Sequence, residues 1–68
     1  MEYSIVISAY NEADKITSSL TQIVNFMRGF AKSFEIVLVD DGSQDNTADL
    51  VDAYSQINPE VVLVGNPH

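Results

Sequence analysis

The sequence has no cysteine and no long apolar run. Without cysteine the chain forms no disulfide bond, and zinc sites that use thiolate ligands are excluded. Apolar runs such as Ile5–Ile7 and Ile36–Val39 fall far short of the ~20 residues needed to cross a bilayer. No charged segment followed by an apolar stretch opens the sequence, as it would in a signal peptide. We therefore expect a cytoplasmic segment that neither crosses a membrane nor is secreted.

Basic residues are also scarce. Lysine and arginine together number 3, against 10 aspartates and glutamates, and the formal net charge is −7. This charge repels phosphate backbones and anionic lipid headgroups, so we expect neither nucleic acid nor an anionic membrane surface as a direct partner. A phosphorylated ligand would need a divalent cation to offset the repulsion.

The chain is short for a domain. Its 68 residues allow one small domain, whereas natural domains more often have about 100 to 150 residues. Hydrophobic residues make up 46% of the chain, which is enough to form a packed core. We therefore treat residues 1–68 as one partial domain of marginal stability.

Three runs rich in β-branched residues predict strands at Tyr3–Ser8, Phe34–Val39 and Val61–Val64. The runs do not alternate between apolar and polar residues, which is typical of strands covered on both faces in a parallel sheet. Two helical segments separate them, which gives the order β-α-β-α-β with short links. The sequence therefore predicts an α/β fold with a parallel, Rossmann-like half-sheet.

Both predicted helices show one apolar stripe. Asn11 is the predicted N-cap of the first helix, and Ser43 or Asp45 that of the second, which Asn58-Pro59 ends. The predicted buried positions are Ile16, Leu20, Ile23, Val24, Met27 and Phe30 in the first helix and Ala48, Leu50, Val51, Tyr54 and Ile57 in the second.

Polar residues gather where the predicted strands end. Residues 8–12 follow the first strand, 40–46 the second and 65–68 the third, and the first two loops are rich in carboxylates and amides. Ligands of open parallel sheets bind beyond the carboxyl ends of the strands. This edge is therefore the predicted site.

The pair Asp40-Asp41 allows three interpretations. It can form a turn, with Gly42 at positive φ. It can instead accept a nucleobase N–H at a strand end, or bind Mg²⁺. The one-sided distribution of polar residues favours a functional role over a turn alone.

The first loop is equally open to more than one interpretation. Tyr10 can stack on a base or lie buried in the core, and its position in the loop favours stacking. Asn11 is better explained as a helix cap than as a ligand contact. Glu12 would favour the helix dipole in either case.

An EF-hand spacing is also present in the second loop, at Asp41, Ser43, Asp45, Thr47, Asp49 and Asp52. We discount it because Asn46 replaces the glycine of that motif and a strand, instead of a helix, precedes it.

Two blocks carry a family resemblance. Ser4–Glu12 and Glu35–Thr47 resemble the opening of family 2 glycosyltransferases, which have the GT-A fold. The Tyr-Asn-Glu form of the first block most resembles the branch that makes polyprenyl-phosphate sugars, such as dolichyl-phosphate mannosyl- and glucosyltransferases. The resemblance implies transfer of a sugar from a UDP- or GDP-sugar to a polyprenyl-phosphate or glycan acceptor.

The same resemblance implies site residues. Nucleotide-binding residues would be Ser8, Tyr10, Glu12, Val39 and Asp41, and the supporting loop would contain Asp40, Gly42 and Ser43. Asp41 would hydrogen-bond the base. Ser8 stands where the family usually has proline.

Catalysis needs more than these residues. By the resemblance, the Asp-x-Asp element that holds Mg²⁺ or Mn²⁺ and the acceptor-activating base are expected downstream of His68. We therefore expect no catalytic residue and no metal ligand in this segment, and no activity from it alone. The complete enzyme would work in the cytoplasm or on the cytoplasmic face of a membrane.

Two other classes of function remain as alternatives. A receiver domain of a signalling relay also holds Mg²⁺ with an acidic pair, but there the pair follows the first strand. A non-catalytic remnant would act as an interaction module and could self-associate through an uncovered sheet edge.

Overall fold

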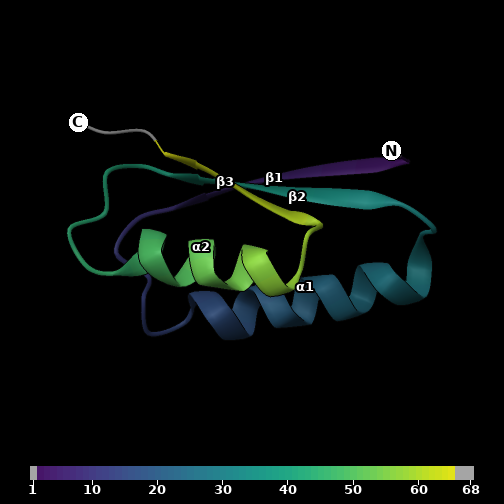
Figure 1. Ribbon diagram of the computed structural model, residues 1–68, viewed down its shortest axis with the longest axis horizontal. Coiled ribbons are helices and arrows are strands. Elements are labelled where there is room, and N and C mark those ends of the chain that lie inside the picture. The colour runs from purple at the N-terminus through teal and green to yellow at the C-terminus, as the bar shows by residue number, and fades with distance from the viewer. Residues whose placement is uncertain (1, 66–68) are drawn as a thin grey trace.

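The computed structural model describes residues 2–65 and confirms the predicted α/β order (Figure 1). The elements are β1 (Tyr3–Ala9), α1 (Ile16–Phe30), β2 (Phe34–Asp40), α2 (Thr47–Ile57) and β3 (Val61–Gly65). Each strand extends one residue beyond its predicted carboxyl end. Within residues 2–65, neither helix has the length and apolar character to cross a membrane.

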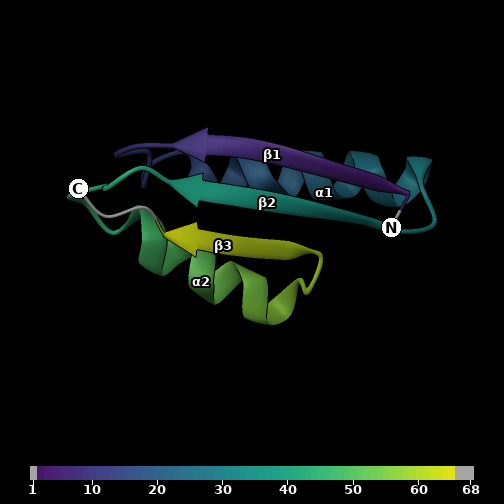
Figure 2. The same ribbon diagram turned by 90° about the horizontal axis from the view of Figure 1, so that it is seen from above.

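The three strands form one parallel sheet in the order β1-β2-β3 (Figure 2). Ile5 pairs with Ile36, and Leu38 pairs with Leu63, so the hydrophobic residues of neighbouring strands lie side by side. The predicted parallel half-sheet is therefore confirmed. Because β2 pairs on both sides, it is the central strand.

The core lies between the sheet and the two helices. Alternate residues of β2, namely Phe34, Ile36 and Leu38, are buried against the helices. The other buried hydrophobic residues are Ala9, Ile16, Leu20, Val24, Met27, Val51 and Val61. Burying a side chain of this kind contributes about 1.5–3 kcal/mol, so this layer supplies most of the stability.

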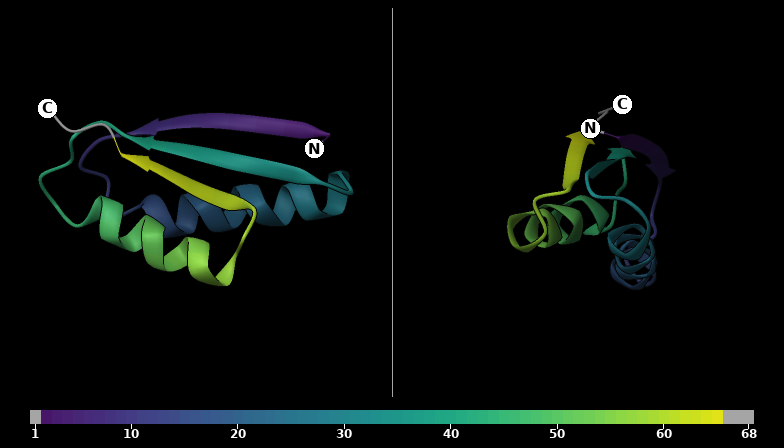
Figure 3. Two further views of the ribbon diagram at one scale, coloured as in Figure 1. Left: turned by 45° about the horizontal axis from the view of Figure 1, so that its top comes forward. Right: turned by 90° about the vertical axis from the view of Figure 1, so that its right-hand side faces the viewer.

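The opposite face of the sheet is not covered by any element within residues 2–65, since both helices lie on one side (Figures 1 and 3). Val6 is 67% exposed there, and Val62 and Val64 are also exposed. The prediction that the strands are covered on both faces is therefore wrong for the described chain. Two successive β-α-β crossovers of the same hand, running in one direction across the sheet, place both helices on the same face.

The helix starts differ from their predicted positions. Asn11 is not an N-cap, because α1 begins only at Ile16, after Lys15, without a side-chain cap. At α2 the N-cap is Asn46, yet the Asp45 carboxylate accepts a hydrogen bond from the Thr47 amide at 3.0 Å. Asp45, a predicted N-cap, lies one residue before the observed N-cap, and its carboxylate still satisfies the first amide of α2.

Two predicted core positions are exposed. Phe30 is 58% exposed and stacks on the exposed Phe26, with ring centroids 5.7 Å apart, and its ring also contacts Tyr3 at 5.3 Å. Ile57, the last residue of α2, is 81% exposed. Both residues lie in the last turn of a helix.

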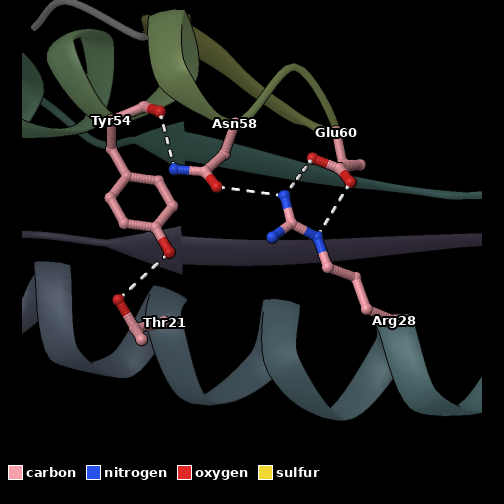
Figure 4. A network of polar contacts seen from close by, with 5 residues as sticks. All are labelled: Thr21, Arg28, Tyr54, Asn58 and Glu60. Atoms are coloured by element: carbon pink, nitrogen blue, oxygen red, sulfur yellow. Dashed lines mark hydrogen bonds and ion pairs between the residues drawn. The ribbon is translucent and has the colours of Figure 1, made fainter.

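A polar network ties α1 to the segment between α2 and β3 (Figure 4). The Arg28 guanidinium donates from two nitrogens to the Glu60 carboxylate, each at 3.1 Å, and also to Asn58 at 3.1 Å. The Asn58 amide donates to the Tyr54 carbonyl, and the Tyr54 hydroxyl hydrogen-bonds Thr21. The hydrogen bond from Arg28 is the main cause of the lowered pKa of Glu60.

We predict that burial, rather than residue type, decides the effect of truncation in the sheet. Leu38→Ala empties a fully buried position and should destabilise the chain by about 2–5 kcal/mol. Val6→Ala removes an exposed side chain and should change the stability by about 0.5 kcal/mol or less. Urea unfolding followed by circular dichroism measures both. Equal losses of stability at the two positions would show that the face of the sheet that carries Val6 is covered in solution.

We also predict a pH-dependent contribution from Glu60. Because its pKa is lowered in the folded chain, its stabilising effect is present above about pH 4.3, the ordinary glutamate value, and is lost as the pH falls through the lower folded value. Glu60→Gln should lower the melting temperature by a few degrees at most at neutral pH and leave it unchanged at a pH below the lowered folded pKa of Glu60. Asp14→Asn, which removes a charge from another exposed position, is the control. A deficit of Glu60→Gln that persists in acid would contradict the ion-pair explanation.

Candidate functional site

The loops after β1 and β2 meet at the carboxyl edge of the sheet (Figure 2). Parallel pairing places Ser8 beside Val39 and Ala9 beside Asp40. One more bond follows beyond the strands, because the Asp41 amide donates to the Ala9 carbonyl at 2.9 Å. The edge that the sequence predicts as the site therefore brings these two polar loops together. The third predicted loop falls largely outside the described residues, since 66–68 are not among them.

Asn11 connects the two loops directly. Its backbone amide donates to the Ser43 hydroxyl at 2.9 Å, and its side-chain oxygen accepts from the Gln44 amide at 2.8 Å. A longer bond of 3.4 Å joins the same oxygen to the Asp45 amide. Asn11 adopts φ 52°, the one positive φ of a non-glycine residue within 2–65.

A second set of bonds lies closer to the core. The Glu12 amide donates to the Thr47 hydroxyl at 2.9 Å, and the Ala13 amide donates to the Asp45 carboxylate at 3.2 Å. Thr47 is fully buried, and its hydroxyl donates in turn to Asp45. This hydrogen bond is the main cause of the lowered pKa of Asp45. The start of α2 is therefore joined to the loop after β1 by satisfied polar groups.

The acidic pair divides into a buried and an exposed carboxylate. Asp40 is 7% exposed, and its carboxylate accepts a hydrogen bond from the Ser43 hydroxyl. Gly42 has φ 73°, as expected for the turn interpretation of this loop. Asp41 is exposed at the end of the sheet. The turn and the ligand-binding interpretations are thus compatible, because Asp40 and Gly42 form the turn while Asp41 is exposed to a ligand.

The residues predicted to bind the nucleotide lie at this edge. Ser8 and Val39 are neighbours on the uncovered face, and Val39 is half-buried. Tyr10 is 48% exposed, so its alternative interpretation as a buried core residue is wrong. Glu12 is exposed at the same end of the molecule. The loops therefore carry an aromatic ring and two exposed carboxylates next to an apolar strand end.

No metal centre is evident in the part of the chain that the structure describes. Among residues 2–65, no group of three or more histidine, aspartate or glutamate side chains is arranged to hold a metal ion. The described residues therefore offer no such cation site by themselves.

Sequence reasoning missed the buried Thr47 and the cross-loop role of Asn11. The spacing Asp45-x-Thr47 before a helix is a signal of a local turn in which a carboxylate accepts from the backbone two residues on. Nothing local in the sequence indicates that Asn11 bonds residues more than thirty positions away. That contact follows only from the parallel register.

The family model "Glycosyl transferase family 2" matches residues 4–68. A dolichyl-phosphate beta-glucosyltransferase of Trichomonas vaginalis is 36% identical over 94% of this chain and 20% of its own length. One from Dictyostelium discoideum is 38% identical over 82% of the chain and 19% of its length.

A bacterial relative is similar to this chain over a comparable range. An undecaprenyl-phosphate 4-deoxy-4-formamido-L-arabinose transferase of Pseudomonas fluorescens is 42% identical over 90% of the chain and 18% of its own length. No solved structure matches the chain significantly. The chain spans about one fifth of the length of the first of these relatives. With nearly the whole chain matched by the family model, the chain belongs to glycosyl transferase family 2.

Proposed function

We propose that this chain is the sugar-nucleotide-binding segment of a glycosyltransferase, and that the two joined loops form the base and ribose end of the donor site. The observation that carries the proposal is the hydrogen-bonded contact between the loops after β1 and β2 in a family 2 chain. Their exposed polar side chains lie beyond the carboxyl ends of parallel strands, where ligands of such sheets bind.

Each residue has a chemical role in this proposal. Asp41 accepts the imide N–H of uracil or the ring N–H of guanine, so the donor is a UDP- or GDP-sugar. Tyr10 stacks on the base through its exposed ring. Ser8, Glu12 and Val39 line the adjoining surface, and Asp40, Gly42 and Ser43 support the loop.

The acceptor and the cation belong to the complete enzyme. The relatives are named for dolichyl phosphate and undecaprenyl phosphate, which favours a polyprenyl-phosphate acceptor over a glycan. With a net charge of −7, the chain needs Mg²⁺ or Mn²⁺ near the donor diphosphate. We propose that residues outside this chain hold that cation and activate the acceptor, at the cytoplasmic face of a membrane.

A non-catalytic interaction module is the second candidate. It is favoured by the exposed valines of the uncovered face, since apolar patches of this kind often mark binding surfaces. The two edge strands, β1 and β3, could also pair with a second copy. Association without nucleotide binding would favour this candidate.

We predict that Asp41→Ala weakens nucleotide binding more than Asp40→Ala does in folded protein. Loss of Asp41 leaves a base N–H without a partner, at a cost of about 1–3 kcal/mol, or about 5- to 150-fold in Kd. Asp40 is buried and accepts a hydrogen bond from the Ser43 hydroxyl, so its loss should act mainly on the stability of the fold. NMR titrations of UDP and GDP into each variant give the dissociation constants.

The matched control is Asp52→Ala, which removes an equal charge from an exposed position on α2. Circular dichroism must show that each variant is folded before its affinity is compared. Equal losses at Asp41 and Asp40, or none at either, would remove Asp41 from the base-reading role.

We also predict that the 68-residue chain alone transfers no sugar. Glycosyl transfer requires stabilisation of the leaving diphosphate and activation of the acceptor, and we assign neither to residues of this chain. The assay combines purified chain, a UDP- or GDP-sugar, Mg²⁺ or Mn²⁺ and a polyprenyl phosphate. Metal-dependent product from protein free of any longer enzyme would overturn the assignment.

A further inference from the structure

Asn11 lies between two residues that we propose contact the nucleotide, but its own hydrogen bonds go to the loop after β2. Its neighbours Tyr10 and Glu12 belong to the proposed site, yet its own side-chain oxygen is directed to the loop after β2, where it accepts from the amides of Gln44 and Asp45. Its own amide donates to the Ser43 hydroxyl. Asn11 is therefore bound to one short segment through both its backbone and its side chain.

The backbone of Asn11 is adapted to this contact. A φ of 52° is unfavourable for most side chains, and asparagine is among the few that tolerate it. Backbone conformations of this kind persist only where the surrounding structure holds them. Here the surrounding structure is the segment 43–45, which supplies the bonds on both sides of the residue.

The bonds of Asn11 continue to the acidic pair. Ser43, which accepts from the Asn11 amide, donates its own hydroxyl hydrogen to the Asp40 carboxylate at the end of β2. Asp41 is the next residue, and its amide is held by the Ala9 carbonyl of β1. A continuous chain of hydrogen bonds therefore leads from the loop that carries Tyr10 to the loop that carries Asp41.

We propose that Asn11 is a positioning residue that fixes the distance between the two halves of the donor site, and that it does so without touching the nucleotide. The inference rests on the proposed function. Its side-chain oxygen is already engaged by two backbone amides, which is the arrangement of a structural link. Holding Tyr10 and Asp41 in place before binding avoids the ordering of two loops at the moment of binding.

Three variants test the link. Asn11→Gly removes the side-chain oxygen but permits the positive φ. Asn11→Asp keeps an acceptor oxygen in the same place and also tolerates this backbone. Ser43→Ala breaks the link from the other side without changing the backbone at position 11. Gln22→Glu, at an exposed position of α1 outside both loops, is the control for an added charge.

Two measurements on the full 68-residue chain are needed. Amide hydrogen exchange at Gln44, without nucleotide, reports the link itself, and NMR titration with UDP and GDP reports affinity. We expect Asn11→Gly to exchange faster at Gln44 and to bind about tenfold more weakly, with Ser43→Ala changing in the same direction. Asn11→Asp should restore both values to within about twofold of those of the Gln22→Glu control.

The outcomes separate this inference from the proposed function. If the unchanged chain binds and Asn11→Gly binds equally well, the positioning role is wrong while the proposed function stands. If Asn11→Asp is as weak as Asn11→Gly, the side-chain NH₂ group matters instead, and Asn11 is a ligand contact. If the unchanged chain binds neither nucleotide, the proposed function fails and the positioning role fails with it. Circular dichroism of every variant separates lost affinity from unfolding.

Discussion

The parallel pairing of β1 with β2 is the constraint on which the rest of this structure depends. It brings Ala9 beside Asp40 and so places two loops, separated by about thirty residues of sequence, at one edge of the sheet. β1 and β2 are paired from Tyr3 with Phe34 to Ala9 with Asp40. Hydrogen bonds from the amides of Asn11, Glu12 and Ala13 extend the contact beyond the strands. Without this register no local feature of either loop would produce a shared surface.

The fold was predictable because its determinants are local and repeated. Buried β-branched runs, helical stripes and short links determine the β-α-β-α-β order, and strand ends were correct to one residue. The sequence did not indicate which face of the sheet is covered. Val6 and Val37 are apolar although no element within residues 2–65 lies over their face of the sheet (Figure 1), so an apolar residue type does not show whether its position is covered.

The meeting of the two polar loops at one sheet edge was predictable, but the contacts between them were not. Strand ends and acidic residues indicate the edge at which the loops meet, whereas the bonds of Asn11 and the burial of Thr47 arise from tertiary contacts between loops. Asn11 has the residue type and the position expected of a helix cap. Its side-chain oxygen instead accepts a hydrogen bond from the Gln44 amide in the loop after β2. Local hydrogen-bonding capacity is thus visible in a sequence, but its partner depends on the fold.

The central claim is that the joined loops form a nucleotide-binding surface, and mapping of backbone amide shifts tests it most directly. Uniformly ¹⁵N-labelled chain is titrated with UDP and GDP, and the shift of every assigned amide is followed. We expect saturable changes concentrated at residues 8–12 and 39–45, with little change at 32–35 and 58–60 on the opposite edge. Saturable changes centred on the opposite edge or on the outer faces of the helices, or no saturable change at all, would contradict it.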